Sequence, residues 1–416
     1  MKNVTYIGTR DKNIRYKASE AILKGICPDG GLFIPEEMPV MEKSIEELAK
    51  MDYRNLAYEV MSLFFTDFTE DELRYCINNA YDSKFDTDKI APVVEKDGVY
   101  FLELFHGKTI AFKDMALSIL PYLMKTSAKK NNIDKEIVIL TATSGDTGKA
   151  ALEGFADVEG TRIIVFYPDG GVSPVQRMQM VTQKGKNVCV AAITGNFDDA
   201  QSAVKSIFTD AEMIKELDDK GFMFSSANSI NIGRLIPQVA YYWYAYCQLV
   251  KDGKIKVGDK INFTVPTGNF GNILAGYFAK KMGLPVNKFV CASNSNKVLY
   301  DFFKTGTYDK NREFILTTSP SMDILISSNL ERLVCMLTSQ EETAKLMKSL
   351  AEKGEYSMTA RADDIVGEYA DEEETATAIR TMYTNADYVL DTHTAVAYVA
   401  YNKYIKESGD TTPTVI

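Results

Sequence analysis

The hydrophobic pattern of the chain changes near residue 96. Before that point apolar residues recur at helical spacing up to about residue 81, and Thr69 followed by three acidic residues is typical of a capped helix start. Beyond it, short apolar runs at 136–141, 162–167 and 187–193 alternate with amphipathic stretches. This alternation predicts strands of a parallel sheet with helices on its faces.

The second half of the chain repeats the alternation, with apolar runs at 261–265 and 288–292. We therefore predict an α/β fold with two parallel-sheet domains and a mainly helical N-terminal segment. The predicted divisions are 1–95 for that segment, 96–225 for a smaller α/β domain and 226–416 for a larger one. Ligands of such sheets bind at the carboxyl ends of the strands, where the glycine-bearing loops of this chain fall.

Composition narrows the classes of function. The 416 residues include 47 basic and 57 acidic side chains, a net charge of −10, which argues against a general nucleic-acid or anionic-membrane surface. The chain has only two histidines, His106 and His393, and six cysteines without CxxC spacing, so we expect no metal site. We expect reduced thiols and a cytoplasmic protein, with no leader and no membrane span.

A lysine in the stretch 104–116 is the first candidate for chemistry. Lys113 follows Ile110, Ala111 and Phe112, and an apolar shelf of this kind can desolvate an amine and lower its pKa. A neutral amine attacks carbonyl groups, so Lys113 is our candidate Schiff-base lysine. The nearby Gly-Lys pairs do not make a P-loop, because neither has a glycine five residues before the pair.

Two further loops and one arginine have the residue types that hold anions. The loop 268–272, Gly-Asn-Phe-Gly-Asn, directs backbone amides to one point at a helix start, although an empty tight turn has the same pattern. Beside Lys113 it becomes a candidate cradle for a cofactor phosphate. The loop 143–148 offers hydroxyls and amides at another helix start. Arg234 can bind a phosphate bidentately, although a surface salt bridge explains it equally well.

Several motifs, in order along nearly the whole chain, resemble those of the threonine synthases, pyridoxal phosphate (PLP) enzymes of fold type II. Residues 106–114 match the family's lysine motif except that Lys108 replaces proline. Residues 28–35 match its opening signature, and residues 225–234 match its Ser-Ala-Asn-Ser segment. Residues 391–396 match its Asp-Pro-His-Thr-Ala-Val motif, with Thr392 replacing proline.

The resemblance implies roles for individual residues. It implies that Lys113 holds PLP, that Thr394 faces the pyridine nitrogen and that Asp146 takes the place of an asparagine beside the ring hydroxyl. The cofactor phosphate would lie on Gly268, Asn269, Phe270, Gly271 and Asn272. The substrate would be held by Thr143, Ser144, Thr147, Ser229, Arg234 and, more weakly, Lys108.

The implied reaction converts O-phospho-L-homoserine and water into L-threonine and phosphate. Two alternatives stay open at this point: another fold type II lyase such as a serine/threonine dehydratase, and a threonine-synthase-like phosphoester-binding protein that has lost activity. We expect a small-molecule substrate, no nucleic-acid or membrane partner, and a monomer or weak homo-oligomer.

Overall fold

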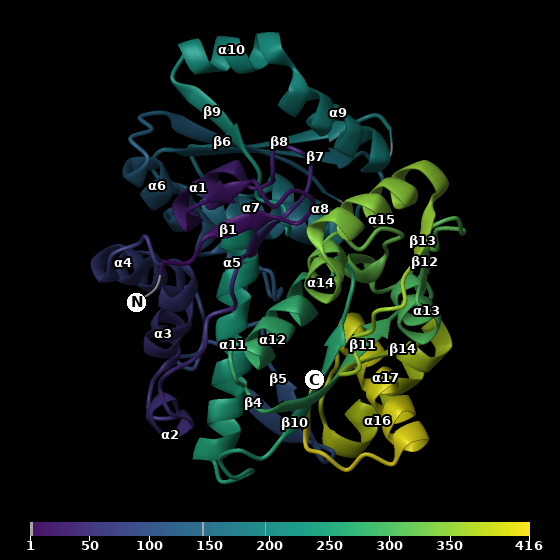
Figure 1. The fold of residues 1–416 in the computed structure, drawn as a ribbon. Coiled ribbons are helices and arrows are strands. Elements are labelled where there is room, and N and C mark those ends of the chain that lie inside the picture. The colour runs from purple at the N-terminus through teal and green to yellow at the C-terminus, as the bar shows by residue number, and fades with distance from the viewer. Residues whose placement is uncertain (1–2, 144, 196) are drawn as a thin grey trace.

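The computed structural model describes residues 3–143, 145–195 and 197–416, which form two α/β units (Figure 1). The smaller unit contains a four-stranded sheet in the order β8-β7-β6-β9, and all three of its strand pairings are parallel. Helices α7 (Asp146–Phe155) and α9 (Phe197–Thr209) pack on this sheet. Its strands are β6 (Glu136–Ala142), β7 (Thr161–Pro168), β8 (Val188–Ile193) and β9 (Phe222–Ser225).

The larger unit is built on a six-stranded sheet in the order β14-β11-β10-β15-β5-β4. Its pairings are parallel except for the antiparallel hairpin of β4 and β5. The expected α/β class with two parallel-sheet units is confirmed. The strands are β4 (Val93–Lys96), β5 (Val99–Leu102), β10 (Ile261–Pro266), β11 (Val286–Ser293), β14 (Ile365–Tyr369) and β15 (Thr414–Val415).

The predicted boundary between 95 and 96 is wrong at one point, because it cuts the β4–β5 hairpin. Tyr100 of β5 pairs with Val415 of the C-terminal strand β15, so the hairpin joins the larger sheet rather than the smaller domain. The division at residue 225 coincides with the end of β9.

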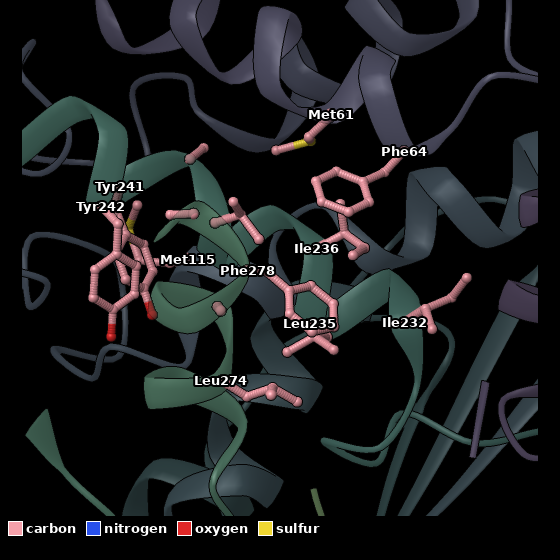
Figure 2. Packing of buried hydrophobic residues seen from close by; sticks show 14 of the residues in the cluster. Met61, Phe64, Met115, Ile232, Leu235, Ile236, Tyr241, Tyr242, Leu274 and Phe278 are labelled. Carbon is pink, nitrogen blue, oxygen red and sulfur yellow. The ribbon is translucent and has the colours of Figure 1, made fainter. Parts of the chain in front are cut away.

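The N-terminal segment is mostly helical but also contains a small antiparallel sheet, β2-β1-β3. Its helix α3 packs against α11, the long helix of residues Ile232–Lys251. In Figure 2, Phe64 of α3 faces Phe278 of α12, and the two rings stack with centroids 6.2 Å apart. The elements of this segment are β1 (Tyr6–Gly8), β2 (Arg15–Tyr16), α1 (Ala18–Lys24), β3 (Phe33–Pro35), α2 (Ile45–Leu48), α3 (Tyr53–Phe64) and α4 (Glu70–Ala80).

Helix α11 lies in the hydrophobic core and is buried from Ile232 to Leu249. Its aromatic residues are core residues, and the hydroxyls of Tyr241 and Tyr242 donate to Asn272 at the start of α12. The remaining elements are α5 (Asp114–Leu117), α6 (Leu120–Lys130), α8 (Pro174–Val181), α10 (Ala211–Asp219), α12 (Gly271–Lys281), α13 (Val298–Thr305), β12 (Thr307–Asp309), η1 (Pro320–Met322), α14 (Leu330–Leu337), α15 (Gln340–Lys353), β13 (Glu355–Ser357), α16 (Glu372–Ala386) and α17 (Thr392–Ser408). Among the described helices, none has the length and apolar character needed to cross a bilayer.

Candidate active site

The loop before Lys113 is folded around Asp114. The Asp114 carboxylate accepts hydrogen bonds from the Thr109 amide at 2.8 Å and the Thr109 hydroxyl at 2.6 Å. Gly107 has no room for a side chain, because a Cβ there would lie 2.5 Å from Asp114 Oδ2. The glycine, threonine and aspartate of the lysine motif therefore shape the turn that presents Lys113 at the start of α5.

Lys113 is desolvated, as the sequence predicts. Its side chain is 11% exposed, and burial lowers the pKa of its amine to about 8 even though Asp146 opposes the shift. The predicted apolar shelf is only partly correct. The Phe112 ring lies 5.0 Å from Nζ, but Ile110 has φ 58° and is 70% exposed, so it points away from the lysine.

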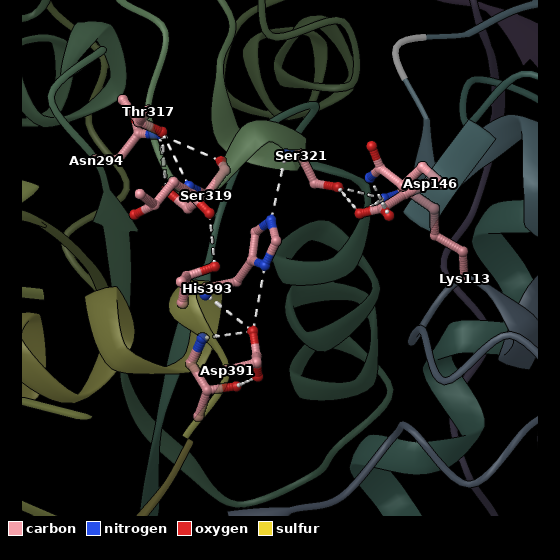
Figure 3. Close-up of polar contacts among 12 residues, drawn as sticks. Lys113, Asp146, Asn294, Thr317, Ser319, Ser321, Asp391 and His393 are labelled. Atoms are coloured by element: carbon pink, nitrogen blue, oxygen red, sulfur yellow. Dashed lines mark hydrogen bonds and ion pairs between the residues drawn. The ribbon is translucent and has the colours of Figure 1, made fainter. Parts of the chain in front are cut away.

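The amine of Lys113 meets two partners from distant parts of the chain (Figure 3). It donates a hydrogen bond to Ser321 Oγ at 2.7 Å and lies 3.8 Å from Asp146 Oδ2. Ser321 Oγ in turn donates to Asp146 Oδ2 at 2.6 Å. Ser321 lies on η1 of the larger unit and Asp146 opens α7 of the smaller one, so this contact joins the two units at the lysine.

Asp146 is held as a carboxylate. Burial alone raises its pKa, but the Lys113 charge and hydrogen bonds from Ser321 and Gln176 outweigh burial and hold the pKa well below its ordinary value. Gln176 Nε2 of α8 donates to Oδ1 at 2.8 Å, and Lys149 Nζ lies 3.7 Å from the same atom. The anionic form suits a role as counter-charge to a protonated nitrogen.

The loop 268–272 makes a tight turn at the start of α12. Gly268 admits no side chain, since a Cβ there would lie 2.4 Å from the Ser321 carbonyl oxygen. Phe270 adopts left-handed backbone geometry (φ 62°) and starts α12, whose first amides have no intrahelical partner. The Asn272 side chain faces the core, where its Oδ1 accepts from the Tyr241 hydroxyl at 2.6 Å. The same Oδ1 accepts from the Tyr242 hydroxyl at 2.8 Å, so two tyrosines of α11 orient the Asn272 side chain.

Within the described residues, Arg234 is a buried cation without a carboxylate partner. It is only 4% exposed, its Nη1 donates to the Ala227 carbonyl at 3.0 Å, and its Nε has no hydrogen-bond partner in the described part of the chain. Burial lowers the pKa of the guanidinium to about 10, which leaves it charged at neutral pH. A buried, unpaired charge is costly, so this arrangement favours binding of an anion.

The other predicted substrate residues differ in their surroundings. The Thr143 hydroxyl accepts from the amides of Gly145 and Gly148 at 3.0 and 2.9 Å, so it shapes the start of α7. Thr147 and Ser229 are half-buried, whereas Lys108 is exposed. Ser144 lies outside the described residues.

Asp391 organises the segment that contains Thr394. It caps α17 and accepts hydrogen bonds from the Thr394 hydroxyl and amide. His393 Nε2 accepts a hydrogen bond of 3.2 Å from the Ser321 amide, so its Nδ1 carries the proton and donates to Asp391 at 3.2 Å. His393 thus supports the turn that presents Ser321.

These residues fit PLP. A lysine of lowered pKa can bind the aldehyde of PLP, and a carboxylate lies next to this lysine. A glycine loop at a helix start can bind the phosphate. The unpaired Nε of Arg234 offers a second anion site. The residues singled out from the sequence do not include Ser321 and Gln176, which both contact Asp146. The segment 320–324 resembles a segment of the same enzymes, and this resemblance is the sequence signal by which Ser321 could have been found.

Comparisons with known proteins agree with this geometry. The profile described as "Threonine synthase N terminus" matches residues 5–81, and the profile described as "Pyridoxal-phosphate dependent enzyme" matches residues 86–416. Threonine synthase of Schizosaccharomyces pombe is 37% identical over 98% of this chain and 85% of its own length. The human protein named threonine synthase-like 1 is 39% identical over 92% of this chain and 54% of its own. The crystal structure of PLP-bound threonine synthase from Brucella melitensis superposes with a TM-score of 0.89 at 35% identity, covering 99% of this chain and 87% of that one.

Proposed function

This chain belongs to the threonine synthase family of PLP-dependent enzymes, and we propose that Lys113 is the residue on which its catalysis depends. The protein is a PLP-dependent carbon–oxygen lyase, a threonine synthase that converts O-phospho-L-homoserine and water into L-threonine and phosphate. The observation that supports the assignment of Lys113 is its buried amine, with a pKa lowered to about 8, facing Asp146 and Ser321.

The cofactor is pyridoxal 5′-phosphate. We assign Lys113 to its aldehyde and the amides of 268–272 to its phosphate, with Thr394 at the pyridine nitrogen and Asp146 beside the ring hydroxyl. When bound, PLP delocalises the negative charge that develops on the substrate carbons. The Thr394 hydroxyl already donates to Asp391, so only its oxygen lone pairs remain to face a ring nitrogen.

Arg234 is our candidate for the substrate phosphate, with Thr147 and Ser229 as hydroxyl donors and Lys108 as a weaker addition. Thr143 and Ser144 are assigned to the substrate carboxylate. The guanidinium is fixed at one end by Ala227 and has an unpaired Nε, so an incoming phosphate compensates a charge that burial already makes costly.

We assign proton transfer to Lys113 Nζ. With a pKa near 8, roughly one amine in ten is neutral at pH 7, so the amine can both take a proton and return it. Ser321 accepts from the amine and Asp146 balances its charge, so both keep Nζ at one place. The proposed role of Nζ is to remove the proton at the substrate Cα and to shuttle protons between the reacting carbons.

The decisive experiment measures phosphate release from O-phospho-L-homoserine. We expect saturable release by the wild type, no ammonia from serine or threonine, and a fall of at least about 10²–10⁴-fold in Lys113→Ala. Lys129→Ala, an exposed lysine on α6, is the control and should keep full activity. Ammonia release would favour a dehydratase, and absence of both reactions in the wild type would favour an inactive phosphoester-binding protein. Wild-type activity in Lys113→Ala would refute the assignment.

We also place the enzyme in the cytoplasm as a monomer or weak homo-oligomer, without nucleic-acid or membrane partners. All six cysteines are free, and five of them are buried, which fits a reducing compartment. The acidic net charge of −10 supports the absence of polyanionic partners. Fractionation and sedimentation velocity test these proposals.

A further inference from the structure

A fully buried arginine contacts segments next to the proposed active site. Arg332 of α14 has no exposed surface. Its Nε donates to the Phe33 carbonyl of β3 at 2.7 Å, its Nη2 donates to the Ile230 carbonyl at 2.5 Å, and its Nη1 donates to Asn329 Oδ1. One guanidinium therefore joins the N-terminal segment, the loop before α11 and the start of α14.

Asn329 extends this connection to the cofactor loop. Its backbone amide and its Nδ2 both donate to the Asn269 carbonyl, at 3.0 and 2.9 Å. Its Nδ2 also reaches the Ser229 carbonyl at 3.4 Å. The side chain thus spans the gap between the loop assigned to the cofactor phosphate and the loop assigned to the substrate phosphate.

The neighbouring acidic residue does not neutralise Arg332 by a direct contact. The Glu331 carboxylate is engaged by the Thr9 hydroxyl at 2.6 Å and by Arg10 at 2.8 and 2.7 Å. The described ion pairs include none for Arg332, whose hydrogen bonds go to two carbonyls and one amide oxygen. A lysine cannot replace this contact set, because three acceptors in different directions need the planar fork of a guanidinium.

We propose that Arg332 and Asn329 are positioning residues that hold the cofactor-phosphate loop and the substrate-phosphate loop in register and anchor both on the N-terminal segment. This inference rests on the assignment of the cofactor phosphate to residues 268–272. It also connects the opening signature 28–35 to the site, since the Phe33 carbonyl accepts a hydrogen bond from Arg332.

The test compares two aldehydes that differ only in the phosphate. Apoenzyme is titrated with PLP and with pyridoxal, which lacks the phosphate, and binding is followed by near-visible absorption. We expect Asn329→Ala to weaken PLP binding by about tenfold or more, because it removes the side-chain donor to the Asn269 carbonyl. We expect a similar loss in Arg332→Lys, because it releases the Asn329 side chain that Arg332 holds through Oδ1. Pyridoxal binding should change little in both variants. The KM for O-phospho-L-homoserine should rise as well, because Ile230 and Ser229 lose their donors.

Arg361→Lys is the matched control, since the Arg361 guanidinium also donates to main-chain carbonyls, those of Met358 and Thr305, on the exposed side of the larger unit. It should leave the ratio of PLP to pyridoxal affinity unchanged. If Arg332→Lys and Asn329→Ala weaken both aldehydes equally, the two residues have a general structural role and the proposal is overturned. The proposal is also overturned if both variants bind both aldehydes as tightly as the wild type does. If the wild type itself binds both aldehydes equally, the phosphate-loop assignment fails instead.

Discussion

The amine of Lys113 donates a hydrogen bond of 2.7 Å to Ser321 Oγ, although 208 positions separate the two residues in sequence. Ser321 is itself held from two sides, by Asp146 through its hydroxyl and by His393 through its amide (Figure 3). The lysine therefore depends on the larger unit for its orientation, while its counter-charge comes from the smaller one.

Removing the Ser321 hydroxyl should slow catalysis without abolishing it. Ser321→Ala leaves the backbone contact with His393 in place but deletes the acceptor of Lys113 Nζ. Hydrogen bonds to charged groups contribute about 1.5–3 kcal/mol, so we expect kcat to fall roughly tenfold to hundredfold. Steady-state phosphate release measures this. Ser349→Ala on α15, where the hydroxyl donates to the Glu355 carbonyl, should have no effect on kcat. A Ser321→Ala enzyme with unchanged kcat contradicts the positioning role.

The rate at which the apoenzyme binds PLP should depend on pH through the protonation of the Lys113 amine. Only the neutral amine attacks an aldehyde, so the association rate of PLP with apoenzyme should rise with pH and level off above about pH 8. Asp146 is the strongest influence that raises the pKa of Lys113, so Asp146→Asn should move the midpoint to lower pH. Stopped-flow absorption at a series of pH values gives both midpoints. A midpoint near 10.5, the ordinary pKa of lysine, would mean that the amine is not desolvated.

Arg234 should lower the thermal stability of the protein and strengthen substrate binding. Its guanidinium is buried and has no carboxylate partner among the residues that the structure describes. Arg234→Met should therefore raise Tm in phosphate-free buffer by removing a desolvated charge. The same change should raise KM for O-phospho-L-homoserine at least about tenfold, while PLP affinity changes far less. In the PLP-loaded protein, where the cofactor occupies the loop 268–272, inorganic phosphate should raise the Tm of the wild type but not that of the variant. Equal loss of substrate and PLP affinity would place Arg234 at the cofactor phosphate instead.

Two glycines of the same loop should respond differently to alanine. A Cβ at Gly268 would lie 2.4 Å from the Ser321 carbonyl oxygen, whereas at Gly271 the nearest atom is Asn329 Nδ2 at 3.4 Å. Gly268→Ala should therefore cost about 1–3 kcal/mol of unfolding free energy and weaken PLP binding by displacing η1. Gly271→Ala is the matched control and should change both quantities less. Chemical denaturation and PLP titration compare the pair, and equal responses would show that the close approach to Ser321 is not maintained in solution.

The local pattern of the sequence was enough to predict the α/β class, because alternating buried runs and amphipathic stretches reflect the periods of strands and helices. It also indicated the lysine and the glycine loop that we propose for the cofactor, since both proposals depend on short contiguous motifs. The predicted shelf was correct for Phe112 but not for Ile110, because the left-handed backbone at Ile110 turns its side chain outward.

Only the tertiary structure decided which distant segments meet. The two-residue strand β15 is too short to leave a periodic signal, yet it joins β10 to β5 and so places the β4–β5 hairpin in the larger sheet. The contacts of Ser321 with Lys113 and of Arg332 with Phe33 likewise link positions with no shared local pattern. Sequence alone therefore predicted the main elements and the groups to which we assign the chemistry. Long-range packing determined the orientation and pKa of those groups, because burial and charge proximity exist only in the folded chain.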